Sequence, residues 1–194
     1  MPRIEAATVA EHHARVETRL VDAAEQLLRA GEPLTAGAVS AAAGIARNSI
    51  YRYVDSVEDL RGMVIARYLP AWVRTVEQAL AAASSPGDRV VVWVRANLAE
   101  ASAAGHDWLR ESMQDQAASA TTEEVDAAHL VMRDTLSNAW LELMHGDAER
   151  AGIAASLTLG ILEGGFRQLG RGAALATVSE LAERASASLV AGLT

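Results

Sequence analysis

Five polar side chains between positions 47 and 52 are of the types that bind DNA. They are Arg47, Asn48, Ser49, Tyr51 and Arg52, here called the polar face, and Tyr53 follows them directly. Guanidinium, amide and hydroxyl groups reach the edges of bases and the oxygens of phosphates. Ile50 and Val54 stand four residues apart and would face the opposite way on a helix. The segment is therefore predicted to be a short helix, from about Arg47 to Val54, that presents its polar face to DNA.

The preceding residues predict the elements that would hold this helix in place. Apolar residues recur at helical spacing from Val16 onward, and that helix should stop at Gly31, because glycine adopts the left-handed cap. Thr35 is predicted to cap a second helix and Gly44 to make the turn after it. Two short helices that cross at a glycine turn can place the second one in the DNA major groove.

These residues resemble the N-terminal domain of the TetR family of one-component transcriptional regulators. The matching pieces are the apolar helix ending at Gly31, the Thr35 cap, Ala43-Gly44-Ile45, Ile50-Tyr51-Arg52-Tyr53 and the capping box Ser56-Val57-Glu58-Asp59-Leu60. The resemblance covers about residues 16 to 66. It departs at three positions, where the family often has Ser or Thr, an aromatic residue and a lysine that touches a phosphate. The residues there are Ala46, Val54 and Val57.

The resemblance implies an all-α fold of about nine helices. Residues 1–66 would form the helix-turn-helix domain that binds DNA, and residues 67–194 a helical domain for ligand binding and dimerisation. The implied function is a sequence-specific regulator, a ligand-responsive repressor that binds a palindromic operator as a dimer. The implied DNA contacts are Thr35, Arg47, Asn48, Ser49, Tyr51, Arg52 and Tyr53, of which Tyr53 could equally pack below the surface.

The rest of the chain is predicted to be helical, with stops at glycines and starts at capping residues. A helix from Ser56 to about Leu80 should bend or break near Pro70, and residues 84–87 should form a loop. Five further helices are expected. The first follows this loop and ends at about 104, and the second spans about 107–118. The last three run from Thr121 to about 145, from 147 to about 169 and from about 174 to 191.

The last two predicted helices carry patterns that suit close helix packing. Small residues recur every four positions in one helix, and apolar residues alternate by three and four in the other. Two such helices from each of two subunits would make a four-helix homodimer interface, although packing within one chain stays open. The residues are Gly152, Ser156, Gly160 and Gly164, and then Leu175, Val178, Ala182, Ala185 and Leu189.

The family resemblance also implies a pocket for a small-molecule effector in the C-terminal domain. Large apolar and polarisable side chains that could line it gather after residue 70, and packing in the core is the alternative for each of them. The helix from Ser56 to about Leu80 would link that pocket to the DNA-binding motif. The candidate lining residues are Trp72, Trp93, Trp108, Met113, His129 and Trp140.

Composition narrows the class of protein. The 194 residues have a net charge of −8, and every one of the 17 basic residues is arginine. Residues 1–69 hold eight arginines against nine acidic residues, so the acidic excess lies mostly after the DNA-binding motif. No apolar run approaches the roughly 20 residues that span a bilayer, and the N-terminus lacks a signal-peptide pattern. We therefore expect a cytoplasmic protein without a membrane partner.

Catalysis, metals and cofactors are not predicted. The chain has no cysteine and no HExxH, GxSxG or phosphate-loop pattern. His12 and His13 are adjacent, and adjacent residues do not share a helical face, so they make a poor metal site. One alternative to a regulator stays open, namely a ligand-binding helical dimer that has lost specific DNA binding. The near-neutral N-terminal domain, Ala46 and Val57 favour it, whereas the intact polar face opposes it.

Overall fold

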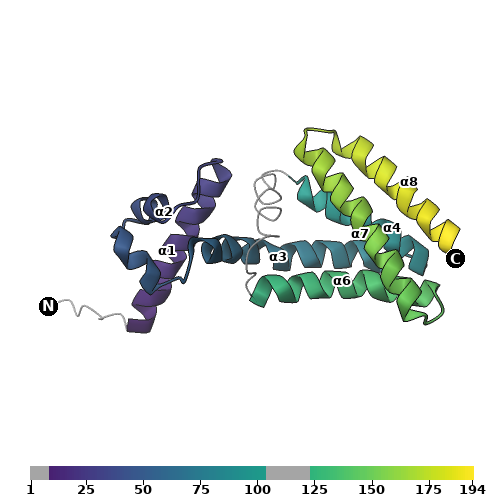
Figure 1. Ribbon diagram of the computed structural model, residues 1–194, viewed down its shortest axis with the longest axis horizontal. Helices are drawn as coiled ribbons and strands as arrows, with labels where there is room; N and C mark the ends of the chain where they lie inside the picture. The colour runs from purple at the N-terminus through teal and green to yellow at the C-terminus, as the bar shows by residue number, and fades with distance from the viewer. Residues whose placement is uncertain (1–8, 104–122) are drawn as a thin grey trace. The chain divides into compact units, whose positions relative to one another are not determined.

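The computed structural model of the chain describes residues 9–103 and 123–194 (Figure 1). Within these ranges the regular elements are seven α-helices and one 3-10 helix, so the all-α prediction is confirmed. The helix predicted at about 107–118 and the capping residue Thr121 lie outside the described residues. The chain forms two compact units that divide between Arg67 and Tyr68.

The first unit contains three helices and the start of a fourth, longer one. These are α1 (Val9–Arg29), α2 (Ala36–Ala43), the 3-10 helix η1 (Arg47–Arg52) and the first part of α3 (Val57–Ala81). α1 packs against α2, and α2 against η1. Their apolar faces form a core in which the following side chains are almost fully buried: Val16, Leu20, Val39, Ile50, Leu60 and Val64.

α3 continues through Pro70 as one helix of 25 residues, so the predicted interruption at this proline does not occur. Pro70 lies on the exposed side of the helix, whereas Leu69 and Trp72 are buried beside it. A proline costs the helix one backbone hydrogen bond, and the burial of its neighbours compensates for that loss.

The second unit is built around α4 (Pro86–Ala101). This helix packs against α6 (Glu123–Leu143), α7 (Ala148–Gly170) and α8 (Leu175–Leu193). α6 also packs on α7, and α7 on α8, which lies beside it after a short turn (Figure 1). Gly165 shows how close these helices come, because an added Cβ there would lie 2.6 Å from the Leu98 side chain of α4.

The start of α4 differs from the predicted loop at residues 84–87. Ser85 is the N-cap and accepts a hydrogen bond from the Asp88 N–H at 3.0 Å, while Pro86 and Gly87 already belong to the first turn. Proline suits this turn, because its missing N–H would have no partner there. The Ser84 and Ser85 hydroxyls donate to the Asp88 carboxylate at 2.7 and 2.8 Å and lower the pKa of that carboxyl.

Buried polar groups of the second unit are paired. The Trp140 indole N–H donates to the Thr158 hydroxyl at 3.0 Å, and this hydroxyl donates to the Ala154 carbonyl at 2.9 Å. Both Trp140 and Thr158 are fully buried. Because a buried N–H without an acceptor is costly, the bond from Trp140 fixes how α6 lies on α7.

Replacing the Thr158 hydroxyl by a methyl group should destabilise the protein. In Thr158→Val the side chain keeps nearly its size, but the buried Trp140 N–H loses its acceptor. We expect the free energy of unfolding to fall by about 1–3 kcal/mol. A urea titration followed by tryptophan fluorescence measures the change.

Thr75→Val is the matched control. The Thr75 hydroxyl donates to the Ala71 carbonyl, four residues earlier, at 3.1 Å, just as Thr158 donates to Ala154. Thr75, however, is exposed. The control should change stability by no more than about 0.5 kcal/mol. Equal effects of Thr158→Val and Thr75→Val would contradict a special role for the buried pair.

Candidate nucleic-acid interface

The turn that leads into the polar face is formed as the sequence predicts. The Thr35 side chain caps α2 by accepting from the Ala38 N–H at 3.1 Å. Gly44 ends α2 in the left-handed conformation, with φ of 68° and ψ of 37°. The next N–H, of Ile45, returns to the Ser40 carbonyl at 3.0 Å. This closing pattern is the usual glycine stop, and it turns the chain sharply into η1.

The segment that carries the polar face is a 3-10 helix, not the α-helix to Val54 that the sequence predicted. The Ser49 N–H bonds the Ala46 carbonyl at 2.8 Å and the Tyr53 N–H bonds the Ile50 carbonyl at 2.9 Å, both three residues back. Ala46 at its start provides no side-chain cap. Short 3-10 runs of this kind replace α-helix where few residues are involved. Ile50 within η1 and Val54 just after it are buried and anchor the segment to the core.

The polar face points away from the core. Arg47, Asn48, Tyr51 and Arg52 are exposed and Ser49 is half-buried, and Tyr51 leaves 60% of its surface to solvent. The exposed Tyr51 hydroxyl is free to form a hydrogen bond with a molecule that binds at this surface. These side chains all come from η1, so the structure brings these predicted DNA contacts together. Thr35, another predicted contact, is exposed at the start of α2.

The arginines of the polar face are not neutralised by neighbours. Neither Arg47 nor Arg52 forms an ion pair with any described residue. Other arginines of the first unit do, since Arg67 meets Asp22 at 2.7 Å and Glu25 at 3.3 Å and so joins α3 to α1. With no described carboxylate beside them, the two guanidinium groups offer their charge to an anion such as a phosphate.

Tyr53, by contrast, is half-buried and packs against α1. Its ring centre lies 4.8 Å from that of His13, and the His13 Nε2 lies 3.2 Å from the carbonyl oxygen of Arg52. In the sequence, His13 stands out only as one member of an adjacent histidine pair. His13 and Arg52 are 39 positions apart in the sequence, so no local pattern would have revealed the contact.

The start of α3 is closed by the predicted capping box. The Ser56 N–H donates to the Asp59 carboxylate at 2.7 Å, and the Asp59 N–H donates to the Ser56 hydroxyl at 3.1 Å. Aspartate thus serves in place of the usual glutamate or glutamine. This box fixes where the chain leaves η1 and enters α3.

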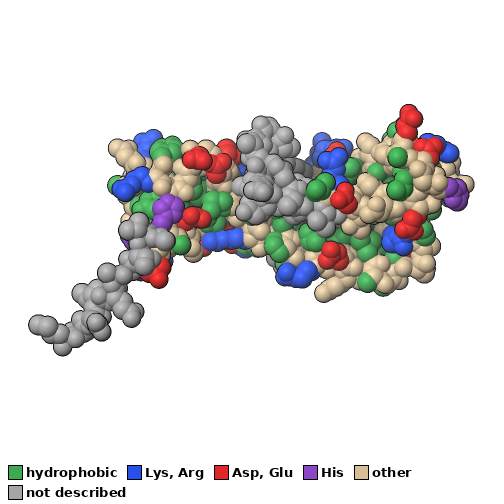
Figure 2. All heavy atoms as spheres, turned by 90° about the horizontal axis from the view of Figure 1, so that it is seen from below, with side chains coloured by type: hydrophobic (Ala, Val, Ile, Leu, Met, Phe, Trp, Pro, Cys, Tyr) green, Lys and Arg blue, Asp and Glu red, His purple; other side chains and the backbone are tan. Residues whose placement is uncertain are grey.

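Charge over the described surface is mixed in sign. On the face in Figure 2, acidic and basic side chains are interspersed and do not gather by sign. A broad basic patch is not seen on this face, so attraction of DNA to it would depend on where individual arginines lie. Among the described residues, no group of three or more His, Asp or Glu side chains could hold a metal ion.

The three described tryptophans among the predicted ligand residues belong to the core. Trp72 donates to the Asn97 side chain at 2.9 Å and Trp93 to the Met132 carbonyl at 3.1 Å, and Trp140 bonds Thr158. All three are buried. Trp108 and Met113 lie outside the described residues, and His129 falls in α6 with a side chain that is not described. That these residues line a pocket stays a prediction.

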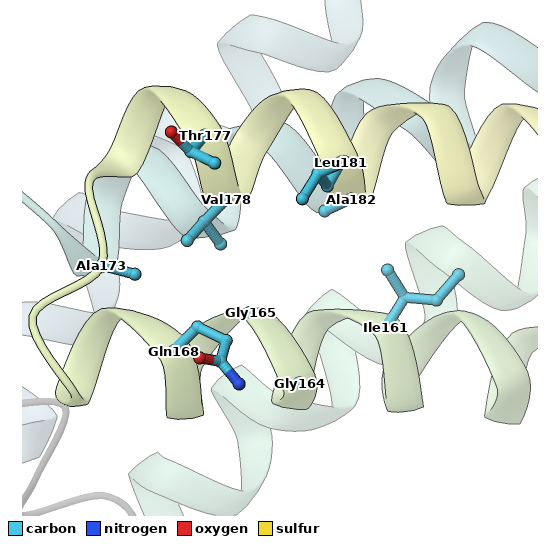
Figure 3. A pocket seen from close by; sticks show the side chains of 9 residues that line it. All are labelled: Ile161, Gly164, Gly165, Gln168, Ala173, Thr177, Val178, Leu181 and Ala182. Atoms are coloured by element: carbon cyan, nitrogen blue, oxygen red, sulfur yellow. The ribbon is translucent and has the colours of Figure 1, made fainter.

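One side of α7 and α8 leaves apolar surface exposed. Ile153, Leu157 and Leu181 are 58%, 51% and 58% exposed, and an added Cβ at Gly152 or Gly160 would meet nothing within 4 Å. A groove of about 380 Å³ runs between the two helices on this side. Figure 3 shows Ile161 and Gln168 from α7 and Val178 and Leu181 from α8 around it. We call this surface the α7–α8 face.

The apolar residues that recur by three and four along α8, here called the α8 seam, pack partly against other helices of the same chain. Val178 and Ala182 are buried against the other helices of the unit, and the Ser186 hydroxyl is buried on the same side. Leu175 and Leu189 are half-buried and Ala185 is exposed. The α8 seam therefore packs mainly inside the second unit, and the small-residue stripe of α7 is the part that stays open.

Comparison with known proteins gives matches in structure but not in sequence. No protein-family model and no curated protein matches the sequence. The transcriptional regulator FadR from Bacillus subtilis, solved with stearoyl-CoA, matches with a TM-score of 0.67 and 13% identity over 88% of this chain and 97% of FadR. RolR, solved with resorcinol, matches with a TM-score of 0.59 and 19% identity over 92% of this chain and 89% of RolR.

A third match carries the family name. QsdR, a transcriptional repressor of the TetR family from R. erythropolis, has a TM-score of 0.53 and 19% identity over 92% of this chain and 95% of QsdR. The chain has the TetR fold. The fold that the sequence resemblance implied is thereby confirmed, and the role of η1 as the second helix of a helix-turn-helix stays a prediction.

The missing cap of η1 gives a direct test of how this TetR-type motif is stabilised. Ala46 has the extended backbone of an N-cap, with φ of −67° and ψ of 136°, but no side-chain acceptor. Ala46→Ser supplies a hydroxyl that can accept from the Asn48 N–H and should raise stability by about 0.5–1 kcal/mol. Thr35→Ala should lower it by about 1 kcal/mol, because it removes an existing cap. Thermal unfolding followed by circular dichroism measures both.

The control is Ala41→Ser, the same change at an exposed position inside α2. Serine is a slightly poorer helix former than alanine, so this variant should lose about 0.5 kcal/mol. A gain at position 41 as large as that at position 46 would show that capping is not the cause.

Proposed function

We propose that the protein is a sequence-specific DNA-binding transcriptional regulator, a ligand-responsive repressor that binds a palindromic operator as a homodimer. The observation that supports this most is the exposed polar face of η1, held by the Gly44 turn and carrying two arginines that form no ion pair with a described residue. Such a face offers hydrogen-bond donors to bases and positive charge to phosphates. A regulator of this kind works where the DNA is, which places the protein in the cytoplasm.

The proposed roles follow from the chemistry of each side chain. Arg47 and Arg52 contact guanine edges or phosphates, since a guanidinium suits both. Asn48 and Ser49 stand at the start of η1, where base contacts are common. The exposed Tyr51 donates its hydroxyl to a phosphate. Thr35 binds phosphate beside the start of α2, and the half-buried Tyr53 reaches a phosphate with its hydroxyl.

A second copy of the chain is the proposed partner of the α7–α8 face. Exposed large apolar residues gain free energy when they are covered, and the open positions at Gly152 and Gly160 allow another helix to come close. The groove between α7 and α8 would accept a side chain from the partner. A twofold dimer presents two copies of η1 to two half-sites, and this is why the operator should be palindromic.

A small molecule is proposed to regulate binding through the second unit. FadR and RolR share the fold and were solved with stearoyl-CoA and resorcinol. α3 starts next to η1 in the sequence and ends in the second unit, so it gives a covalent path for the signal. An effector can weaken operator binding if it binds the DNA-free conformation more tightly. The proposed lining residues are Trp72, Trp93, Trp108, Met113, His129 and Trp140.

The function is tested by fluorescence anisotropy with DNA from upstream of the protein's own gene, beside a scrambled duplex and at two salt concentrations. Tight binding to one palindromic segment that persists at the higher salt supports the proposal. Arg47→Ala and Tyr51→Ala should each weaken that binding by about tenfold or more, because each removes a direct contact. Arg47→Ala should also reduce the salt dependence by about one unit of slope if it binds phosphate.

Arg74→Ala is the matched control, since Arg74 is exposed on α3 in the second unit and forms no ion pair with a described residue. It should leave operator binding unchanged within about twofold. Unchanged binding in the Arg47 and Tyr51 variants would refute the assigned polar face. Weak, salt-sensitive binding of the unaltered protein to every duplex would favour the alternative, a ligand-binding helical dimer without specific DNA binding.

The proposed dimer is tested at Leu157, which is half exposed on the α7–α8 face. Leu157→Glu would bury a charge against the partner and should weaken dimerisation at least tenfold. Leu130→Glu changes a leucine that is 61% exposed on α6 and should leave the dimer intact. Sedimentation velocity over a concentration series distinguishes the two. A protein that is monomeric before mutation, or a dimer that tolerates Leu157→Glu, would overturn this part of the proposal.

A further inference from the structure

His13 on α1 makes two contacts with the end of η1. Its Nε2 lies 3.2 Å from the Arg52 carbonyl oxygen, and its ring centre lies 4.8 Å from that of Tyr53 with the planes tilted by 46°. A carbonyl oxygen can only accept, so Nε2 must carry the hydrogen. The distance between the rings is within the range of favourable aromatic pairs.

The orientation of the His13 ring is itself supported from α1. The Glu17 carboxylate lies 3.6 Å from Nδ1, one turn further along the same helix. This distance is too long for a hydrogen bond, and the carboxylate attracts the ring as an ion pair when both imidazole nitrogens carry a proton. Both His13 and Glu17 keep part of their surface exposed, so this support is a side-chain arrangement at the surface of the first unit, not a buried network.

The end of η1 needs an external support more than most helices do. Six residues in 3-10 geometry have few internal hydrogen bonds, and no side chain caps the start at Ala46. At the other end, the Tyr53 N–H and the Val54 N–H both bond the Ile50 carbonyl, at 2.9 and 3.3 Å. The Arg52 carbonyl is bonded by His13 from outside the segment.

We propose that His13 is a positioning residue that holds the C-terminal end of η1, and with it Arg52 and Tyr53, in the orientation that reads DNA. This rests on the proposed DNA-binding function. His13 acts through the backbone of Arg52 and the ring of Tyr53, and it does not itself contact DNA. The other member of the histidine pair, His12, is exposed and makes no described contact, so it provides the natural comparison.

The first measurement is amide hydrogen exchange of the free protein, which needs no DNA. His13→Ala should raise the exchange rates of the Tyr53 and Val54 amides by about tenfold, the combined effect of one hydrogen bond and one ring contact. His13→Gln keeps a side-chain N–H donor and should restore part of the protection. His12→Ala should leave these rates unchanged. Equal rates in the unaltered protein and His13→Ala would overturn the proposal.

The second measurement is operator affinity. His13→Ala should weaken binding by about tenfold and His13→Gln by about threefold, whereas His12→Ala should stay within about twofold of the unaltered protein. Circular dichroism at the assay temperature confirms that each variant is folded. Loss of affinity in His12→Ala equal to that in His13→Ala would point to a general charge effect and would overturn the proposal.

The decisive background is the double variant Arg52→Ala with Tyr53→Phe. It retains the carbonyl and the ring that His13 touches, but it lacks the guanidinium and the hydroxyl that would reach DNA. In this background His13→Ala should weaken operator binding by less than about threefold, because the guanidinium and the hydroxyl that His13 positions are gone. A loss that stays at about tenfold would mean that His13 binds DNA directly and would overturn the proposal.

The two hypotheses fail separately. If the unaltered protein binds no duplex specifically, the proposed function fails, and the exchange rates still decide whether His13 holds the end of η1. If the unaltered protein binds its operator and His13→Ala binds equally well, the positioning role fails and the proposed function stands.

Discussion

The left-handed backbone at Gly44 is the constraint on which the arrangement of α2 and η1 depends. A φ of 68° is costly for a residue with a Cβ but not for glycine. This one turn lets the last carbonyls of α2 find partners, because the N–H groups of Gly44 and Ile45 fold back onto Ala41 and Ser40 at 3.2 and 3.0 Å. It also redirects the chain, so that Ile50 enters the core. The exposure of the polar face is therefore a consequence of Gly44 and Ile50 together.

A different constraint governs the second unit, where large aromatic side chains are buried with their polar atoms. Each of the three described indole N–H groups needs an acceptor, and each finds one on another helix: Trp72 on Asn97, Trp93 on Met132 and Trp140 on Thr158. Because these bonds are directional, they fix how neighbouring helices are rotated about their axes. Helix surfaces rich in alanine would otherwise pack in several similar ways, since small side chains interlock weakly.

Local features of the fold could be predicted from the sequence, and features that depend on distant residues could not. The caps at Thr35, Ser56 and Asp147 follow from side chains that bond an N–H only three residues away. The contact of His13 with Arg52 joins residues that no pattern connects. The sequence predicted a short helix at η1, but not its 3-10 geometry, because that depends on how Ile50 and Tyr53 pack against distant residues.

The boundaries that were mispredicted also have physical causes. Ser84 to Gly87 contains serine, proline and glycine, which are frequent in loops, yet proline and serine are equally suited to the start of a helix. At Pro70 the burial of Leu69 and Trp72 outweighs the lost backbone bond. The seam of α8 showed the correct periodicity, but periodicity does not say whether an apolar face meets its own chain or another, and Val178 turns out to face its own unit.

An acidic protein that reads DNA must place its positive charge locally. Carboxylates in the first unit neutralise Arg29, Arg61 and Arg67, and these ion pairs stabilise the scaffold while adding little attraction to DNA. Arg15 and Arg19 of α1 and Arg47 and Arg52 of η1 form no ion pair with a described residue. The two on η1 would give four guanidinium groups in the proposed dimer. If all four met phosphates, the binding constant would vary with salt with a slope of only about −4. Weak electrostatic attraction also limits binding to unrelated DNA, so discrimination would depend on the orientation of a few side chains on η1. That is why the support of a six-residue 3-10 helix matters more here than it would on a strongly basic surface.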